Sequence, residues 1–222
     1  MRSRGISFSI HPQSMTIMNE KRIIIAARVL SVVFTPFYLP FMGMLALFLF
    51  SNMSIYPFFG KLFIITMVYL FTILLPTLLI RIYQHYHGWT PIELGTKERR
   101  IVPYIISIVC YFTCFYMMKR LHIPHFMCSI LIAALFIQIA CALINVRWKI
   151  STHTAAIGGV AGAIMAFANI FIFNPSWWLS LVMILGGMVG TSRMILRQHT
   201  LSQVVAGFVV GVFFAYFSIL FM

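Results

Sequence analysis

Acidic side chains are nearly missing from this sequence. It contains no aspartate, and Glu20, Glu93 and Glu98 are the only acidic residues among 222. Enzymes that use Mg²⁺ or Ca²⁺ in phosphoryl transfer hold the ion with clustered carboxylates, so this composition argues against metal-dependent phosphotransferases, aspartyl-phosphate enzymes and relays of paired acids. We therefore predict no metal site and no cofactor, and expect any phosphate chemistry to be metal-free.

Charged residues of either sign make up only 9% of the chain, whereas 62% of residues are hydrophobic and the mean hydropathy is +1.00. This composition predicts a multi-spanning membrane protein. The 16 Lys and Arg give a net charge of +13. They are scattered between apolar segments, which argues against nucleic acid and favours the lipid bilayer and phosphate groups as partners. The cysteines all lie inside apolar runs and are expected to be packing residues: Cys110, Cys114, Cys128 and Cys141.

Hydropathy divides the chain into a basic N-terminal segment, residues 1–28, and a single transmembrane domain, residues 29–222. The unbroken apolar runs fit spanning helices rather than strands, although two of the runs are short. The predicted fold class is therefore all-α, a polytopic transmembrane bundle of six or seven spanning helices. Pro36, Pro40 and Pro76 should kink the first two helices. Residues 81–102 form the one polar connection of any length. The apolar segments are 29–50, 62–80, 103–118, 126–146, 154–173, 178–190 and 203–222.

Three polar clusters interrupt the apolar runs, and an even number of predicted crossings separates each from the next. All three are therefore expected at one face of the membrane. They are "GTKERRIVP" at 95–103, "RWKISTHTAAIGG" at 147–159 and "GTSRMILRQHTLSQ" at 190–203. The second and third each predict a histidine in the first turn of an incoming helix, with Ser151 and Thr200 as caps. Helix N-termini with arginines beside them suit a phosphoryl group, whereas interfacial snorkelling residues are the alternative.

These residues resemble the type-2 phosphatidic acid phosphatase family, the membrane branch of the vanadate-haloperoxidase superfamily. "SRMILRQH" has Ser-Arg, five residues and then His, and "STHT" places a Ser two residues before a His. Both features are similar to signature motifs of that family, and the resemblance covers about residues 97–211. It implies the helical fold of the family. "KERRIVP" is only loosely similar to the remaining motif.

The resemblance also implies roles for individual residues. His199 would form a phosphohistidine, His153 would act as general acid and base, and Arg193 would neutralise charge on the phosphoryl oxygens. Gln203 stands where the family usually has an Asp, four residues after His199, and its amide oxygen is expected to fix the histidine tautomer. Either Lys97 or Lys149 would supply the lysine of the site, and Arg197 is equally a candidate headgroup contact. The candidate phosphate-binding residues are Ser151, Lys97, Arg100, Lys149 and Arg197.

The function that the resemblance implies is metal-independent hydrolysis of a phosphorylated membrane lipid. Candidate substrates are phosphatidylglycerophosphate, another phosphorylated phospholipid or a polyprenyl pyrophosphate. Two alternatives stay open: a transferase of the same fold that passes the phosphoryl group or phospho-headgroup to a lipid hydroxyl, and a catalytically lapsed lipid-binding protein, which Gln203 motivates. Nothing in the sequence identifies a partner protein.

The basic residues also predict an orientation in the inner (plasma) membrane. Of the 16 Lys and Arg, only Lys61, Lys119 and Arg120 fall on the face opposite the three clusters, which leaves 13 on the cluster face. The positive-inside rule then places the site in the cytoplasm. Bacterial members of the family that this chain resembles usually work at the outer face, so the two lines of reasoning disagree. We expect the cytoplasmic face.

Overall fold

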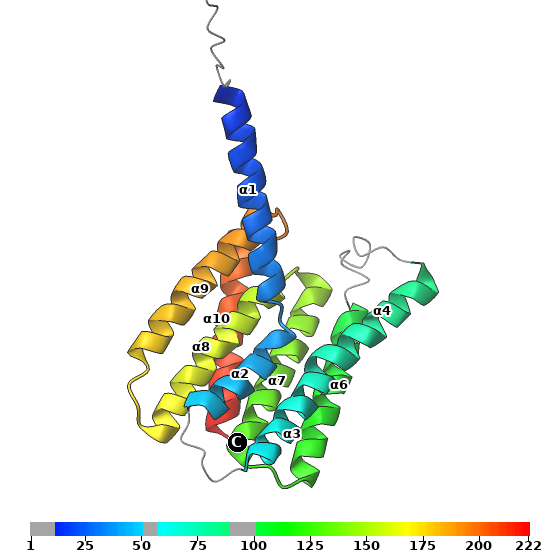
Figure 1. The fold of residues 1–222 in the computed structure, drawn as a ribbon, viewed down its shortest axis with the longest axis vertical. Helices are drawn as coiled ribbons and strands as arrows, with labels where there is room; N and C mark the ends of the chain where they lie inside the picture. Colours follow the sequence, from blue (N-terminus) through cyan, green and yellow to red (C-terminus); the bar gives the residue numbers. More distant parts are fainter. Residues whose placement is uncertain (1–11, 51–56, 89–100) are drawn as a thin grey trace, which may run out of the picture.

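The computed structural model describes residues 12–50, 57–88 and 101–222, and within these ranges the chain is helical with no strand. Figure 1 shows the helices gathered into one bundle, apart from the N-terminal part of the first helix. The elements are α1 (Pro12–Val33), α2 (Tyr38–Phe50), α3 (Phe58–Tyr69), the π-helix η1 (Leu70–Leu74), α4 (Leu75–His87), α6 (Ile101–Arg120), α7 (His125–Arg147), α8 (Thr152–Phe171), α9 (Ser176–Ile195) and α10 (Leu201–Leu220).

Six helices in the described ranges are long and apolar enough to cross a membrane, and a seventh crossing results if the bent pair α1–α2 is one span. The predicted all-α bundle of six or seven spans is therefore confirmed. The two short apolar runs belong to full helices of 20 residues each, α6 and α9. They are longer than the apolar runs because polar and basic residues, such as Arg120 and Arg193, occupy their last turns.

The predicted break in the helix occurs at Pro36, whereas Pro40 and Pro76 lie inside continuous helical stretches. Between residues 33 and 38 the chain leaves the helix around Pro36, and the two halves meet at 66°. At Pro76 the helix continues, and the π-helical turn η1 directly precedes it, with the Leu75 N–H donating to the Leu70 carbonyl. A proline ring crowds the carbonyl four residues back, and a wider turn relieves that crowding.

The polar connection begins later than predicted. The sequence suggested a loop from residue 81, but α4 continues to His87 and ends at Gly88, which adopts φ 63°. Side chains one turn apart support this last stretch, since the His87 ring packs 4.4 Å from the Tyr83 ring, measured between centroids. Glu93, Glu98, Lys97, Arg99 and Arg100 lie outside the described residues.

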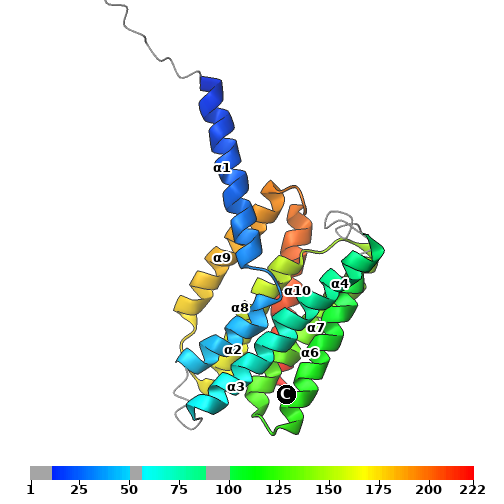
Figure 2. The same cartoon turned by 45° about the vertical axis from the view of Figure 1, so that its right-hand side comes forward.

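One end of the bundle collects the ends of helices that carry the second and third polar clusters. α7 ends there, α8 begins, α9 ends and α10 begins, as Figures 1 and 2 show. The prediction that these two clusters share a face is confirmed. The four cysteines are buried and free, which confirms that they are packing residues.

The backbones of α8 and α10 are in direct contact along a seam of glycines. An ideal Cβ built on Gly158 or Gly162 would lie 2.1 or 2.4 Å from a backbone oxygen of α10. One built on Gly207 would lie 2.5 Å from the carbonyl oxygen of Ser151, just before α8, and one on Gly211 would lie 1.9 Å from that of Ala155 in α8. Real Cβ atoms do not approach so closely, so these four positions allow only glycine at this helix separation. Small residues at such a spacing permit close helix packing in membranes.

Replacing Gly211 with Ala should therefore force the two helices apart. Its methyl group would lie 1.9 Å from the Ala155 carbonyl oxygen, and overpacking of this kind costs about 1–3 kcal/mol. Gly187→Ala is the matched control, because a Cβ on Gly187 meets nothing within 4 Å. Unfolding in mixed micelles titrated with SDS should show Gly211→Ala clearly less stable than the native chain and Gly187→Ala unchanged or more stable. Equal stability of the two variants would contradict the direct backbone contact between α8 and α10 at Gly211.

Candidate active site

Three chain segments converge at the end of the bundle where α8 and α10 begin. The backbone N–H of Ser151 donates to the carbonyl of Gln203 over 3.3 Å, which joins the start of α8 to the first turn of α10. The third segment is α9, which packs against the starts of both α8 and α10. An ideal Cβ on Gly190 would lie 2.8 Å from Val204 and 3.9 Å from Thr154. The second and third polar clusters, which lie about 40 residues apart in the sequence, are thus brought into one site.

The start of α8 is capped as predicted. Ser151 is the N-cap and its hydroxyl oxygen accepts the Thr154 N–H over 3.4 Å, while the Thr154 hydroxyl donates back to the Ser151 carbonyl over 3.0 Å. A hydroxyl that accepts one hydrogen bond still has its own proton to donate. His153 is the second residue of the helix and is half-buried. The cap therefore leaves Ser151 able to donate toward an anion beside His153.

Arg193 occupies the last turn of α9 and is only 8% exposed. Its Nη1 donates to the hydroxyl oxygen of Ser31, a residue of α1 that is itself 7% exposed. Sequence reasoning missed Ser31, which is a lone serine in an apolar run 162 residues away from its partner. No local pattern signals such a pair.

The turn after α9 sets the position of Arg197. The Gln198 N–H bonds the Arg193 carbonyl over 3.1 Å and the Arg197 N–H bonds the Met194 carbonyl over 2.9 Å, the pattern of a Schellman motif. Glycine usually fills the left-handed position of this motif, but here Arg197 does, at φ 52°. Its side chain is exposed, unlike that of Arg193. The structure therefore separates the two arginines, one buried within the site and one at its surface.

His199 is 8% exposed, and Gln203 fixes the protonation of its ring. His199 Nδ1 lies 3.1 Å from Gln203 Oε1, and the same oxygen accepts the backbone N–H of Thr200 over 3.2 Å. Because a backbone N–H only donates, the amide atom that it meets must be the oxygen. Nδ1 must then carry a proton, and in the neutral ring Nε2 carries the lone pair. The structure thus has the His199–Gln203 contact that the four-residue interval predicts, while the role of Gln203 stays a prediction.

One prediction about His199 was wrong. The sequence suggested that it lies within the first turn of the incoming helix, as His153 does. Instead Thr200 is the N-cap of α10, with Gln203 completing a capping box, and His199 comes one residue before the helix. Threonine satisfies the N-terminal N–H groups better than histidine does, so the helix begins after it.

The remaining candidate cations are only partly described. Lys149 is half-buried two residues before Ser151, so it lies at the same end of the bundle as the cap of α8. Lys97 and Arg100 lie outside the described residues. The other described histidines, His85, His87, His122 and His125, are all exposed, and His11 lies outside the described residues.

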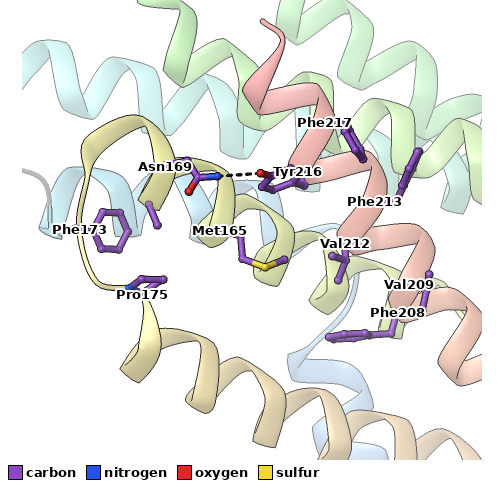
Figure 3. A pocket seen from close by; sticks show the side chains of 11 residues that line it. Met165, Asn169, Phe173, Pro175, Phe208, Val209, Val212, Phe213, Tyr216 and Phe217 are labelled. Atoms are coloured by element: carbon purple, nitrogen blue, oxygen red, sulfur yellow. Dashed lines mark hydrogen bonds between the residues drawn. The ribbon is translucent and has the colours of Figure 1, made fainter.

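An apolar cleft of about 740 Å³ lies farther along α8 and α10. Figure 3 shows its walls, where Met165 faces Phe208 and Val212, and an Asn169–Tyr216 hydrogen bond of 2.9 Å crosses one side. Phe208 lies seven residues after Leu201, so the cleft begins about 10 Å along the helix from the site end. None of the site residues that the structure describes lines this cleft.

Residues 146–222 match the profile of the PAP2 superfamily. The matched segment contains the whole of α8, α9 and α10, and with them both histidines, Arg193 and Gln203. This match confirms the family resemblance over that segment. A search of curated proteins and a search of solved structures found no match.

Loss of the Gln203 side chain should impair the site through His199. Gln203→Ala removes the acceptor for Nδ1–H, so both tautomers become populated and the rate of phosphoryl transfer should fall by roughly ten- to a thousandfold, less than the ~10⁴ that follows mutation of a triad carboxylate. Gln203→Glu keeps an acceptor and should retain more activity than Gln203→Ala. Gln198→Ala, an exposed glutamine in the preceding turn, should leave the rate unchanged. A native rate in Gln203→Ala would mean that another group orients the ring.

Proposed function

We propose that this chain, with its PAP2 superfamily segment at residues 146–222, is a metal-independent phosphatase that hydrolyses a phosphorylated membrane lipid through a phosphohistidine. The observation that carries the proposal is the 3.1 Å contact between His199 Nδ1 and Gln203 Oε1. It leaves Nε2 as a nucleophile in a nearly buried ring, at the point where a capped helix start and a buried arginine meet. A histidine held this way is suited to nucleophilic catalysis.

The reaction proceeds in two steps, phosphorylation of His199 and hydrolysis of the phosphohistidine. In the first, His199 Nε2 attacks phosphorus, the bond from phosphorus to the lipid oxygen breaks, and His153 gives its proton to the departing alkoxide. In the second, His153 takes a proton from water as the water oxygen attacks the phosphohistidine. The N–P bond breaks, phosphate leaves and His199 regains its lone pair. The same histidine thus acts as acid in one step and as base in the other.

Cationic and hydrogen-bonding groups of the chain stabilise the charge on the phosphoryl oxygens. Arg193 is the buried cation of the site, and the Ser151 hydroxyl and the N–H groups at the start of α8 add neutral donors. Lys149 supplies a further charge from the same end of the bundle, and we assign the same role to Lys97 and Arg100. With no aspartate and three glutamates in the sequence, these groups take the place that a metal ion has in other phosphoryl-transfer enzymes.

A lipid substrate is supported by the setting of the site. The six candidate spans indicate a multi-pass membrane protein, so the site lies at the end of a bundle surrounded by lipid. The cleft between α8 and α10 is lined mainly by apolar side chains and begins about 10 Å along α10 from the site. A hydrocarbon chain attached to a bound phosphate would reach it. The substrate candidates are phosphatidylglycerophosphate, another phosphorylated phospholipid and a polyprenyl pyrophosphate. Arg197, exposed beside the site, is assigned to the lipid headgroup.

The decisive experiment measures both products and metal dependence. Purified protein is incubated with these lipid phosphates and with a short soluble phosphomonoester, and both free phosphate and new phospholipid species are quantified. We expect free phosphate from at least one lipid, little from the soluble ester, full activity in EDTA and inhibition by vanadate, which mimics the phosphoryl transition state. New phospholipid without free phosphate would identify a transferase instead, and loss of activity in EDTA that Mg²⁺ restores would refute the metal-free mechanism.

Substitution of the two histidines tests the order of the steps. His199→Ala should abolish turnover because no phosphohistidine forms. His153→Ala should remove the acid and base, so that a substrate with a good leaving group phosphorylates the protein and is released slowly. Rapid quenching with labelled phosphate ester, followed by detection of an acid-labile phosphohistidine, makes the distinction. Near-native turnover by His199→Ala would remove the nucleophile from the mechanism.

We also propose that the site faces the cytoplasm. Lys61, Lys119 and Arg120 lie at the end of the bundle opposite the site, and the other 13 basic residues fall on the cluster side of the predicted topology. In a background lacking the four native cysteines, Gln198→Cys places a thiol beside the site and Asn174→Cys places one at the other end; both positions are exposed. An impermeant maleimide added to intact cells should label only Asn174→Cys. Labelling of Gln198→Cys instead would reverse the orientation.

A further inference from the structure

The N-terminal helix α1 contacts the bundle through a narrow seam. Among its described side chains only Ala27 and Ser31 are buried, and these lie one helical turn apart on the same face. Figures 1 and 2 both show the end of α1 against the upper part of α9, while the beginning of α1 projects beyond the bundle. Two small residues at this spacing allow two helices to approach closely.

The contact between α1 and the bundle includes Arg193, the buried arginine of the site. Arg193 Nη1 donates to the Ser31 hydroxyl oxygen, and both side chains are more than nine-tenths buried. A buried hydrogen bond to a charged group is among the stronger ones in proteins. The arginine side chain has several rotatable bonds, whereas its guanidinium is a rigid planar fork, so a bond at Nη1 restricts the orientations that the whole plane can adopt.

The position of Ser31 is itself fixed by packing. Directly after it, Phe34 and Leu39 flank the 66° bend between α1 and α2 and pack against a buried cluster of α8 and α9 that includes Ile157 and Val189. The hydroxyl therefore lies in the last turn of α1, next to a bend whose side chains pack against α8 and α9. Both α1 and this bend lie outside residues 146–222.

We propose that Ser31 is a positioning residue for Arg193, so that the N-terminal helix completes a phosphate site whose other parts come from α8, α9 and α10. This inference rests on the proposed function. Ser31 does not touch the substrate. It holds one edge of the guanidinium, and the plane that results aims the opposite edge at the phosphoryl oxygens between Ser151 and His199. A phosphate bound there meets a preoriented cation rather than one that must be ordered during binding.

The test compares two hydroxyls of the same helix end. Ser31→Ala removes the hydroxyl that Arg193 contacts. Thr35→Val removes a hydroxyl in the turn just after α1, which donates to the backbone carbonyls of Ser31 and Val32. Ser31→Ala should lower kcat/KM by roughly 10- to 100-fold, the loss expected for a hydrogen bond to a charged group. Thr35→Val should not change it, and Ser31→Thr, which keeps the hydroxyl, should recover most of the activity.

Two further measurements separate positioning from a structural role. In an Arg193→Ala background, Ser31→Ala should cause no additional loss of kcat/KM, because the residue that it positions is gone. Vanadate should raise the Tm of the native protein and of Thr35→Val more than that of Ser31→Ala, even if the three proteins unfold at one temperature without vanadate. A vanadate response of Ser31→Ala equal to that of Thr35→Val, or an additive loss in the double variant, would overturn the inference.

The same experiments distinguish this inference from the function on which it rests. If the native protein hydrolyses a lipid phosphate and Arg193→Ala is inactive while Ser31→Ala is fully active, the role of Ser31 is refuted and the phosphatase stands. If the native protein hydrolyses no lipid of the panel, the proposed function fails. The vanadate response of Ser31→Ala against Thr35→Val then still decides whether Ser31 orients an anion-binding arginine.

Discussion

The backbone contact between α8 and α10 is the constraint on which the site depends. Four glycines, Gly158, Gly162, Gly207 and Gly211, let carbonyl oxygens of one helix lie where side chains of the other would normally stand. At the end of this seam the Ser151 N–H reaches the Gln203 carbonyl. That bond sets the distance between a helix that carries one histidine and the capping box that holds the other. The distance between α8 and α10 therefore sets the distances between the site residues. Side-chain adjustments at the site could not compensate for a change in that distance.

A neutral residue orients His199, the histidine that we propose as the nucleophile. Gln203 supplies the acceptor that His199 needs, and its second hydrogen bond, to the Thr200 N–H, prevents the amide from turning its nitrogen toward the ring. It adds no negative charge to the site. In the proposed mechanism, the imidazolium that forms during turnover is therefore less stabilised than it would be beside an aspartate. The attraction of Arg193 for phosphate, in turn, is not reduced by a neighbouring anion. Compared with an aspartate, Gln203 stabilises the imidazolium less but leaves the attraction between Arg193 and phosphate unchanged.

Much of the fold and the local parts of the site follow from the sequence, because they depend on spacing. Spans of about 20 apolar residues show in hydropathy, the Ser151 cap shows in "STHT", and the four-residue interval between His199 and Gln203 predicts their hydrogen bond. The end of α4 was missed because Tyr83 and His87 stabilise a polar stretch that hydropathy assigns to a loop. His199 was placed one residue too far into α10, because Thr200 competes for the cap. Ser31 could not be found, because a tertiary contact across 162 residues leaves no periodic trace.

The oxygen shared by His199 and Thr200 has a stereochemical consequence. The imidazole cannot swing away from α10 without losing its hydrogen bond to the Gln203 oxygen, which the helix cap holds in place. In the proposed reaction, a phosphoryl group on Nε2 therefore stays where it was formed. In the proposed reaction, the departing alkoxide and the entering water must then use the same side of phosphorus, opposite the ring. Each in-line displacement inverts the phosphorus centre, and two inversions restore it. If the lipid phosphate is made chiral at phosphorus by isotopic and sulfur substitution, the thiophosphate that hydrolysis releases would show net retention of configuration.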